Sequence, residues 1–347
     1  MQNVRQIIFL TIGVSVIIVL IVWAVWILPL FVRSQSDPTQ TDRSSDSARK
    51  TPSPAVAKAR GSSGSPGTVK EVLEGMIQDF PRAEVEAFLD EHERSESNLL
   101  AAHALTSDAS YLEEALQRFP DSPSVLVAIL SQEKTRANAV ELAETLTFLE
   151  PDNALSHYLH GKALLDAGKV DAAFVALSDG ASASLFQATY TEQIEGLTAF
   201  HEFQGSSPDL ALIKSVFGGQ LYHLGKMQKL TQELTAYNSQ DDMAVGVGVA
   251  MGNHLSQGAG NHLLINQLVG LSIEQQFLEN SPPETFNPFL NQTHGELLQD
   301  IERQRIHLRE LVQKGELEQL TPEEAASYAR ITLEEGEEAA IRKAFPE

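Results

Sequence analysis

Apolar residues along the chain follow two patterns. Residues 6–32 form one uncharged run of 27 positions, and about 20 apolar residues are enough to span a bilayer as a helix. The run is longer than the core of a cleaved signal peptide and ends in Trp23, Trp26, Pro29 and Phe31 rather than in small residues. We therefore expect a retained transmembrane helix in the lipid bilayer, preceded by a short tail at 1–5.

The second pattern begins at Thr68 and is helical almost to the end. Thr68 and Glu71 match a capping box, and alternating strand patterns are not evident after it. Ser207 and Pro208 predict the start of a helix that reaches Leu224, with a break at Gly225 before a further helix to Tyr237. The fold class predicted from this pattern is all-α.

Later segments continue the helical pattern. The apolar, Gly-rich stretch 243–255 predicts a closely packed buried helix, and Pro282, Pro283 and Pro288 predict a loop after it. A long helix is expected next, followed by one that begins at Thr321 and by a short one at 337–344. The apolar seam expected on the long helix consists of Leu298, Ile301, Leu308 and Val312.

Composition separates the two patterns. Residues 33–67 are rich in Ser, Pro and Gly and contain one aliphatic residue larger than Ala, Val56, so we expect a disordered linker. Its flexible-chain reach is roughly 30–35 Å.

Short sequences recur at intervals typical of helical repeats. LEGMIQDFP at 73–81 and LEEALQRFP at 112–120 lie 39 residues apart, and AETLTFLEP ends 31 residues later at Pro151. Helix-turn-helix repeats of solenoids have similar periods. We therefore predict a helical repeat domain over 68–280, and a proline-rich loop with C-terminal helices over 281–347.

Residues 151–183 resemble a tetratricopeptide repeat. The match rests on the turn Pro151, Asp152 and Asn153, on the small residues Gly161, Gly168 and Ala173, and on the apolar residue Leu164. Departures are His157, His160 and Gly180, at positions where the family has an aromatic residue, Leu and a small residue near the second helix end. The resemblance implies an α-solenoid with C-terminal capping helices.

In that family the first helices of the repeats line a concave groove that binds a protein or peptide. The resemblance places six residues there: Val127, Ser131, Leu155, Tyr158, Lys162 and Leu165. The alternative for Leu155 and Tyr158 is a place in the core.

Charge excludes one class of partner. The chain has a formal net charge of −22, and residues 69–347 hold 18 basic and 44 acidic residues. Such a domain repels phosphate, so no nucleic-acid binding is expected. The layout is similar to that of membrane-anchored tetratricopeptide proteins of the bacterial envelope, and we expect a single-pass inner-membrane protein with an extracytoplasmic C-terminal domain.

Candidate chemistry is sparse. GNHL occurs twice and places His254 and His262 eight residues apart, while His157 and His160 lie three apart. Zinc takes three or four protein ligands, and the sequence has no Cys, HExxH, phosphate-binding glycine loop or nucleophile elbow. We expect no metal, no cofactor and no catalytic residue.

The leading functional hypothesis is therefore a membrane-tethered scaffold or adaptor for protein–protein interaction. Two alternatives stay open: a self-associating structural membrane protein, and an enzyme with an unrecognised site around His254 and His262.

Overall fold

The structure, a computed structural model, describes residues 80–132, 136–188, 190–237, 242–258, 263–279, 281–314, 317 and 320–346. The chain divides into two units, Met1–Ser62 and Ser63–Glu347, and every described residue belongs to the second. The predicted tail 1–5, transmembrane helix 6–32, linker 33–67 and capping box at Thr68 lie outside the described residues. Among the described residues, no helix has both the length and the apolar character that a membrane crossing needs.

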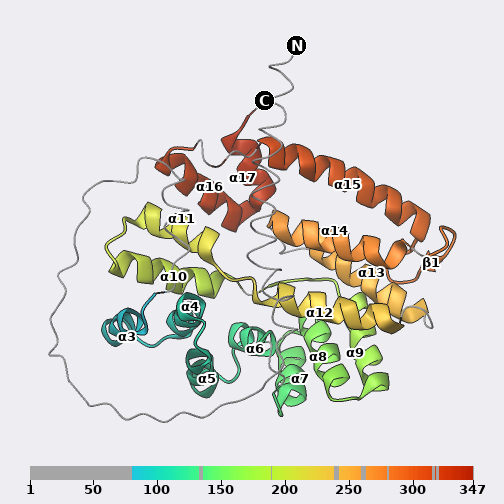
Figure 1. Cartoon of the computed structure of the whole chain (residues 1–347), viewed down its shortest axis with the longest axis horizontal. Helices are drawn as coiled ribbons and strands as arrows, with labels where there is room; N and C mark the ends of the chain where they lie inside the picture. The colour runs from blue at the N-terminus through green and yellow to red at the C-terminus, as the bar shows by residue number, and fades with distance from the viewer. Residues whose placement is uncertain are drawn as a thin grey trace, which may run out of the picture. The chain divides into compact units, whose positions relative to one another are not determined.

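The described residues are mostly helical, which confirms the all-α prediction. The helices, labelled in Figure 1, are α3 (Arg82–Glu91), α4 (Glu96–Thr106), α5 (Ala109–Arg118), α6 (Pro123–Leu130), α7 (Ala139–Leu149), α8 (Ala154–Asp166), α9 (Val170–Ser182), α10 (Thr191–Phe203), α11 (Pro208–Gly218), α12 (Tyr222–Tyr237), α13 (Asp242–Gln257), α14 (Leu264–Leu278), α15 (His294–Lys314), α16 (Pro322–Glu335) and α17 (Glu337–Ala344). Two short strands, β1 (Phe286–Asn287) and β2 (Gln292–Thr293), complete the set.

Helices that follow one another along the chain pack in pairs (Figure 1). Extensive contacts join α8 to α9, α10 to α11, α13 to α14 and α16 to α17. Further contacts join helices far apart in sequence: α4 with α10, α9 with α13, and α11 with α16. In an ideal solenoid each unit contacts only its sequence neighbours, so these contacts are additional to the pairs. The repeat assignment over 68–280 stays a prediction.

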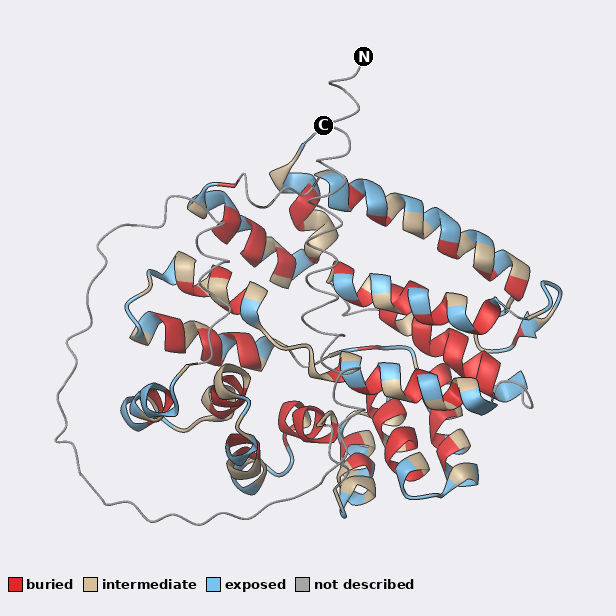
Figure 2. Cartoon of the chain, viewed as in Figure 1, coloured by how far each residue is buried: buried red, intermediate tan, exposed pale blue. Residues whose placement is uncertain are grey.

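Most helices bury one side against their neighbours and leave the other in solvent, while α6 and most of α13 are buried all round (Figure 2). The largest apolar cluster contains residues from α6 through α9 and from α11 through α17. A second cluster joins α3, α4, α5 and α6 to α10 through Phe88 and Phe200, whose ring centroids lie 5.4 Å apart. The paired helices therefore share cores that extend well beyond each pair.

Local capping chemistry fixes several helix ends where the sequence predicts them. The Ser207 hydroxyl accepts a hydrogen bond from the Leu210 amide at the start of α11, and Thr321 and Glu324 complete a capping box at the start of α16. The last helix has the predicted bounds, 337–344.

The predicted break at Gly225 is wrong. α11 ends at Gly218, and α12 runs from Tyr222 to Tyr237 with Gly225 inside it. A Cβ at Gly225 would meet no atom within 4 Å, whereas one at Gly219 would lie 2.6 Å from the Tyr190 hydroxyl oxygen. The glycine that permits the close approach is therefore the one at position 219.

The predicted seam of the long helix α15 is correct only in part. Ile301 and Leu308 are buried, but Val312 is 43% exposed. Leu297 and Leu311 are buried and take the remaining places on the packed face. The helix itself was predicted correctly, and its buried side is rotated slightly from the predicted one.

A small β-hairpin lies within the segment predicted as a loop. β1 and β2 pair antiparallel, with Phe286 opposite Thr293. Asn287 is fully buried, and its side-chain amide donates to the Gly246 carbonyl of α13 at 3.3 Å. Its oxygen accepts from the Phe289 amide at 3.0 Å. Asn287 thus fixes the turn to α13. The hairpin could not be predicted, because strands of two residues are too short to show alternation in the sequence.

Candidate functional site

The α8–α9 pair, which carries the repeat resemblance, is built on small residues. A Cβ at Gly161 would lie 2.5 Å from Leu177 side-chain atoms and 3.3 Å from the Ala173 carbonyl oxygen. Gly161 therefore lets α8 approach α9 closely, as its spacing predicts. Gly168 joins the two helices with φ of 72°, a conformation that glycine adopts without steric cost.

The start of α8 is tied to the segment that follows α9. The Asn153 side-chain oxygen accepts from the Leu155 amide at 3.2 Å and from the Gln187 amide at 3.0 Å. An isolated parallel bridge also joins Asn153 to Leu185, with a hydrogen bond of 2.8 Å from the Ala154 amide to the Leu185 carbonyl. These contacts close the pair at the end opposite Gly168.

The six predicted groove residues lie on α6 and α8 or directly after them. Leu155 and Tyr158 are fully buried, Val127 and Lys162 are buried, and Ser131 and Leu165 are half-buried. Leu155 and Tyr158 therefore lie in the core, which was the alternative to a place in the groove. Their role in binding a partner stays a prediction.

Later helices cover this side of α8. α12 contacts α6 and α8, and α13 contacts α8 and α9. The Tyr158 hydroxyl and the Nδ1 of His254 in α13 lie 2.8 Å apart, within hydrogen-bond distance. A partner would have to displace α12 or α13 to reach Tyr158.

Charged side chains meet where α12 crosses α8. Lys162, only 4% exposed, pairs with Asp166 on its own helix and with Glu233 of α12 at 2.9 Å. Lys226 of α12 donates to the Gln132 carbonyl at 2.9 Å, and burial lowers the pKa of this lysine. Buried charges of this kind are retained when they are paired, because an unpaired one is costly.

A small cavity lies beside this polar crossing. It is lined by Ile129, Leu130, Arg136, Ala139, Leu159, Ala163, Asp166 and Lys226, and its volume is about 10 Å³. That is the space of a single water molecule. Arg136 pairs with Glu113 at 2.9 Å, while its Nε is buried without a protein partner. The cavity suits a bound water and has no room for an organic substrate.

The histidines singled out from the sequence have different surroundings. The His254 ring lies between the Tyr158 hydroxyl and the Ala183 carbonyl, 3.1 Å away, and burial lowers its pKa. His262 lies outside the described residues. His157 contacts the Pro151 carbonyl at 2.8 Å, while the Nε2 of His160 is buried without a partner. In the described part of the chain, no three His, Asp or Glu residues are grouped as a metal site.

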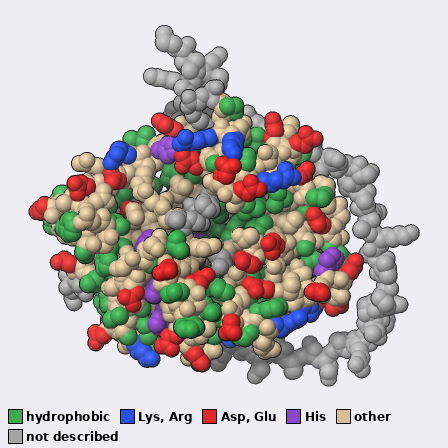
Figure 3. Space-filling model, turned by 180° about the vertical axis from the view of Figure 1, so that it is seen from behind, with side chains coloured by type: hydrophobic (Ala, Val, Ile, Leu, Met, Phe, Trp, Pro, Cys, Tyr) green, Lys and Arg blue, Asp and Glu red, His purple; other side chains and the backbone are tan. Residues whose placement is uncertain are grey.

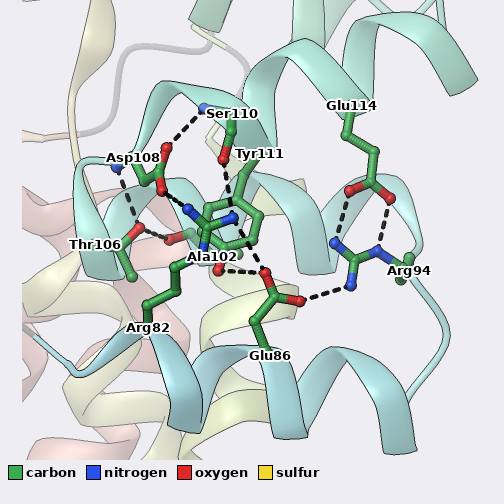
Figure 4. Close-up of polar contacts among 9 residues, drawn as sticks. All are labelled: Arg82, Glu86, Arg94, Ala102, Thr106, Asp108, Ser110, Tyr111 and Glu114. Atoms are coloured by element: carbon green, nitrogen blue, oxygen red, sulfur yellow. Dashed lines mark hydrogen bonds and ion pairs between the residues drawn. The ribbon is translucent and has the colours of Figure 1, made fainter. Parts of the chain in front are cut away.

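A charged network that sequence reasoning missed joins α3 to α5 (Figure 4). Arg94 donates two hydrogen bonds of 2.6 Å to the Glu114 carboxylate and one of 3.0 Å to Glu86. These bonds hold the pKa of both carboxyls below their usual range. Tyr111 donates to Glu86 at 3.0 Å, and burial raises its pKa to about 12. Arg82 also pairs with Glu86 at 3.5 Å and Arg118 with Glu114 at 3.4 Å, so neither carboxylate depends on Arg94 alone, which favours a role in holding the first helices together.

A second missed group is Glu274 of α14. Its carboxyl accepts a hydrogen bond of 2.7 Å from the Ser256 hydroxyl of α13, and the residue is only 2% exposed. Burial raises its pKa to about 7. α13 and α14 approach closely here. A Cβ at Gly270 would lie only 2.5 Å from the Gly252 carbonyl oxygen. A glutamate in an apolar helical stretch gives no local sign that it will be buried.

Comparison with known proteins finds no matching family model, curated protein or solved structure.

Proposed function

We propose that this protein is a membrane-tethered helical scaffold that binds another protein. The observation that carries the proposal is the α8–α9 pair, where Gly161 packs against Leu177 and Gly168 makes the turn. This close packing supports the assignment of a tetratricopeptide-like unit, and helical repeats of this kind present extended surfaces to protein partners. The proposal includes a solenoid over 68–280 with capping helices after it.

The tether is the second part of the proposal. Residues 6–32 anchor the chain in the bacterial inner membrane, and residues 33–67 link the anchor to an extracytoplasmic helical domain. What supports this is the uncharged run of 27 residues followed by a Ser, Pro and Gly-rich segment. A partner is then bound near the membrane surface, within the reach of the linker.

Site-specific photo-crosslinking in native membranes tests the scaffold. A photoreactive residue is placed at Phe148, Phe286 or Ile306, three exposed positions on different elements, and adducts are identified by mass spectrometry. We expect a discrete heterologous adduct from at least one position and none from fully buried Tyr158. Adducts made only of two copies of this chain would favour the self-associating alternative, and absence of any adduct would refute the scaffold.

A reporter fused after Glu347 tests the topology. An alkaline phosphatase fusion, active only outside the cytoplasm, should be active, and a fluorescent protein that matures only in the cytoplasm should be dark. The opposite pair of results would reverse the orientation without affecting the scaffold proposal.

A further inference from the structure

We propose that the partner docks on the outer side of α7, α8 and α9, and that the docking segment is basic and apolar. The surface, called here the α7–α9 face, consists of Glu144 and Phe148 of α7, His157 and His160 of α8, and Val175 and Asp179 of α9. This inference rests on the proposed scaffold function, and it names the surface and the chemistry of the partner.

The α7–α9 face lies on the side of α8 away from α12 and α13. Tyr158 and Lys162 are one turn apart and contact α13 and α12. His157 and His160 are one turn apart on the other side and are half-buried. Because later helices cover the inner side, the outer side is the part of this helix pair that solvent reaches.

Apolar contacts bring the three helices together, because Val140 of α7 packs against a cluster of Leu164 of α8 with Ala173 and Ala176 of α9. Burial lowers the pKa of His160, and the nearby carboxylates of Glu144 and Asp179 oppose that shift. Both acids, one on α7 and one on α9, are therefore near enough to His160 to act on it electrostatically. Phe148 lies one turn after Glu144, so the two share one face of α7. Val175 lies one turn before Asp179, so these two share one face of α9.

The two apolar side chains are unusually exposed. Phe148 is 85% exposed and Val175 is 63% exposed, the highest values among the exposed large hydrophobic residues of the described chain. Single exposed hydrophobic residues are ordinary, but here the two most exposed ones lie on α7 and α9, which both pack on α8, and exposed aromatic residues are typical interface anchors. Each would leave water when a partner binds.

The charge around them is acidic. Asp166 pairs with Lys162. Otherwise the exposed charged side chains of residues 139–182 are five carboxylates and one ammonium: Glu141, Glu144, Asp152, Asp171, Asp179 and Lys169. Carboxylates are also spread over the side of the molecule seen in Figure 3, where basic side chains lie mainly along the upper and lower margins. A segment with Lys or Arg beside apolar residues complements this surface in charge and in anchors.

A defined peptide probes the α7–α9 face. The full chain in nanodiscs of neutral lipid is titrated with a photoreactive amphipathic Leu/Lys helix, and the adduct is quantified on a gel. We expect saturable labelling that weakens with salt, and little labelling by a matched Leu/Glu helix. Phe148→Ala should raise the half-saturating peptide concentration about tenfold, while Ile306→Ala, an exposed apolar control, should leave it unchanged.

A second pair of variants tests the charge. Glu144→Gln with Asp179→Asn should weaken labelling and flatten its salt dependence, whereas Glu302→Gln with Glu334→Gln on α15 and α16 should not. All four substituted side chains are exposed, so the variants should unfold at nearly unchanged urea concentrations. Equal effects of the test and control variants would overturn the inference.

Other occupants of the face are separate outcomes. Crosslinks from position 148 to the basic segment 43–60 of the same chain, or to a second copy, would replace the proposed partner with that occupant. In native membranes, an adduct at position 306 without one at 148 would refute the face and leave the scaffold standing. No adduct at any position would refute both.

Discussion

Position 161 offers the sharpest test of the helix packing. A Cβ there would lie 2.5 Å from both Cγ and Cδ2 of Leu177, well inside the ~3.5–4.0 Å of a favourable carbon contact. Leu177 is fully buried, so its side chain has no solvent into which it could rotate. Gly161→Ala must therefore move the two helices apart or force Leu177 out of its rotamer.

The expected magnitude follows from two opposing terms. Alanine is favoured over glycine in a helix interior by about 1 kcal/mol, and overpacking a core costs about 1–3 kcal/mol. Gly161→Ala should lower the free energy of unfolding by about 1 kcal/mol. Gly225→Ala is the matched control, because this helical glycine is exposed and has no neighbour within 4 Å of a Cβ, and it should raise the free energy of unfolding by about 1 kcal/mol.

Urea unfolding of the full chain in detergent, followed by far-ultraviolet circular dichroism, measures both changes. Leu177→Ala alone should cost about 2–5 kcal/mol, and in that background Gly161→Ala should become neutral or stabilising. The double-mutant cycle should therefore show a coupling of about 1–3 kcal/mol. Equal stabilisation by the two alanines, or strict additivity with Leu177→Ala, would refute the close approach of α8 and α9.

Two further predictions concern buried polar side chains. The pKa of Glu274 is raised from 4.5 to about 7 in the folded protein, so its unfolded state loses the proton first and stability falls as pH rises between these values, by on the order of 3 kcal/mol. Glu274→Gln should remove this pH dependence, and a stability difference between variant and parent that is equal at pH 5 and pH 8 would contradict it. Asn153→Ala removes the α8 cap and the bonds to Gln187 and should cost about 2 kcal/mol in urea unfolding. Ser207→Ala, which loses one exposed capping bond, should cost about 1 kcal/mol, and a larger loss at Ser207 would contradict the assigned roles.

Helix ends were predictable because their chemistry is local. Ser207, Thr321 and Asn153 each bond to an amide two or three residues away, so the sequence alone contains the signal. The break predicted at Gly225 rested on a weak local preference, since glycine disfavours a helix by only about 1 kcal/mol. Burial of Met227 and Leu230 in α12 outweighs that amount.

The inner side of α8 could not be predicted in the same way. Lys162 meets Glu233, 71 positions later, and Tyr158 meets His254, 96 positions later. The resemblance to a repeat describes how α8 packs on α9, but it contains no information about helices that return from so far along the chain. Periodicity also gave no indication that Glu274 would be buried.

The bridge between Asn153 and Leu185 has a consequence for how such a domain can grow. Because the backbone enters α8 and leaves α9 at adjacent points, a duplicated copy of this segment could be spliced in beside the original without stretching the flanking chain. Lengthening by whole hairpins is thus geometrically inexpensive at this junction, and a tandem duplication of residues 154–185 is the rearrangement that the architecture would accommodate most readily.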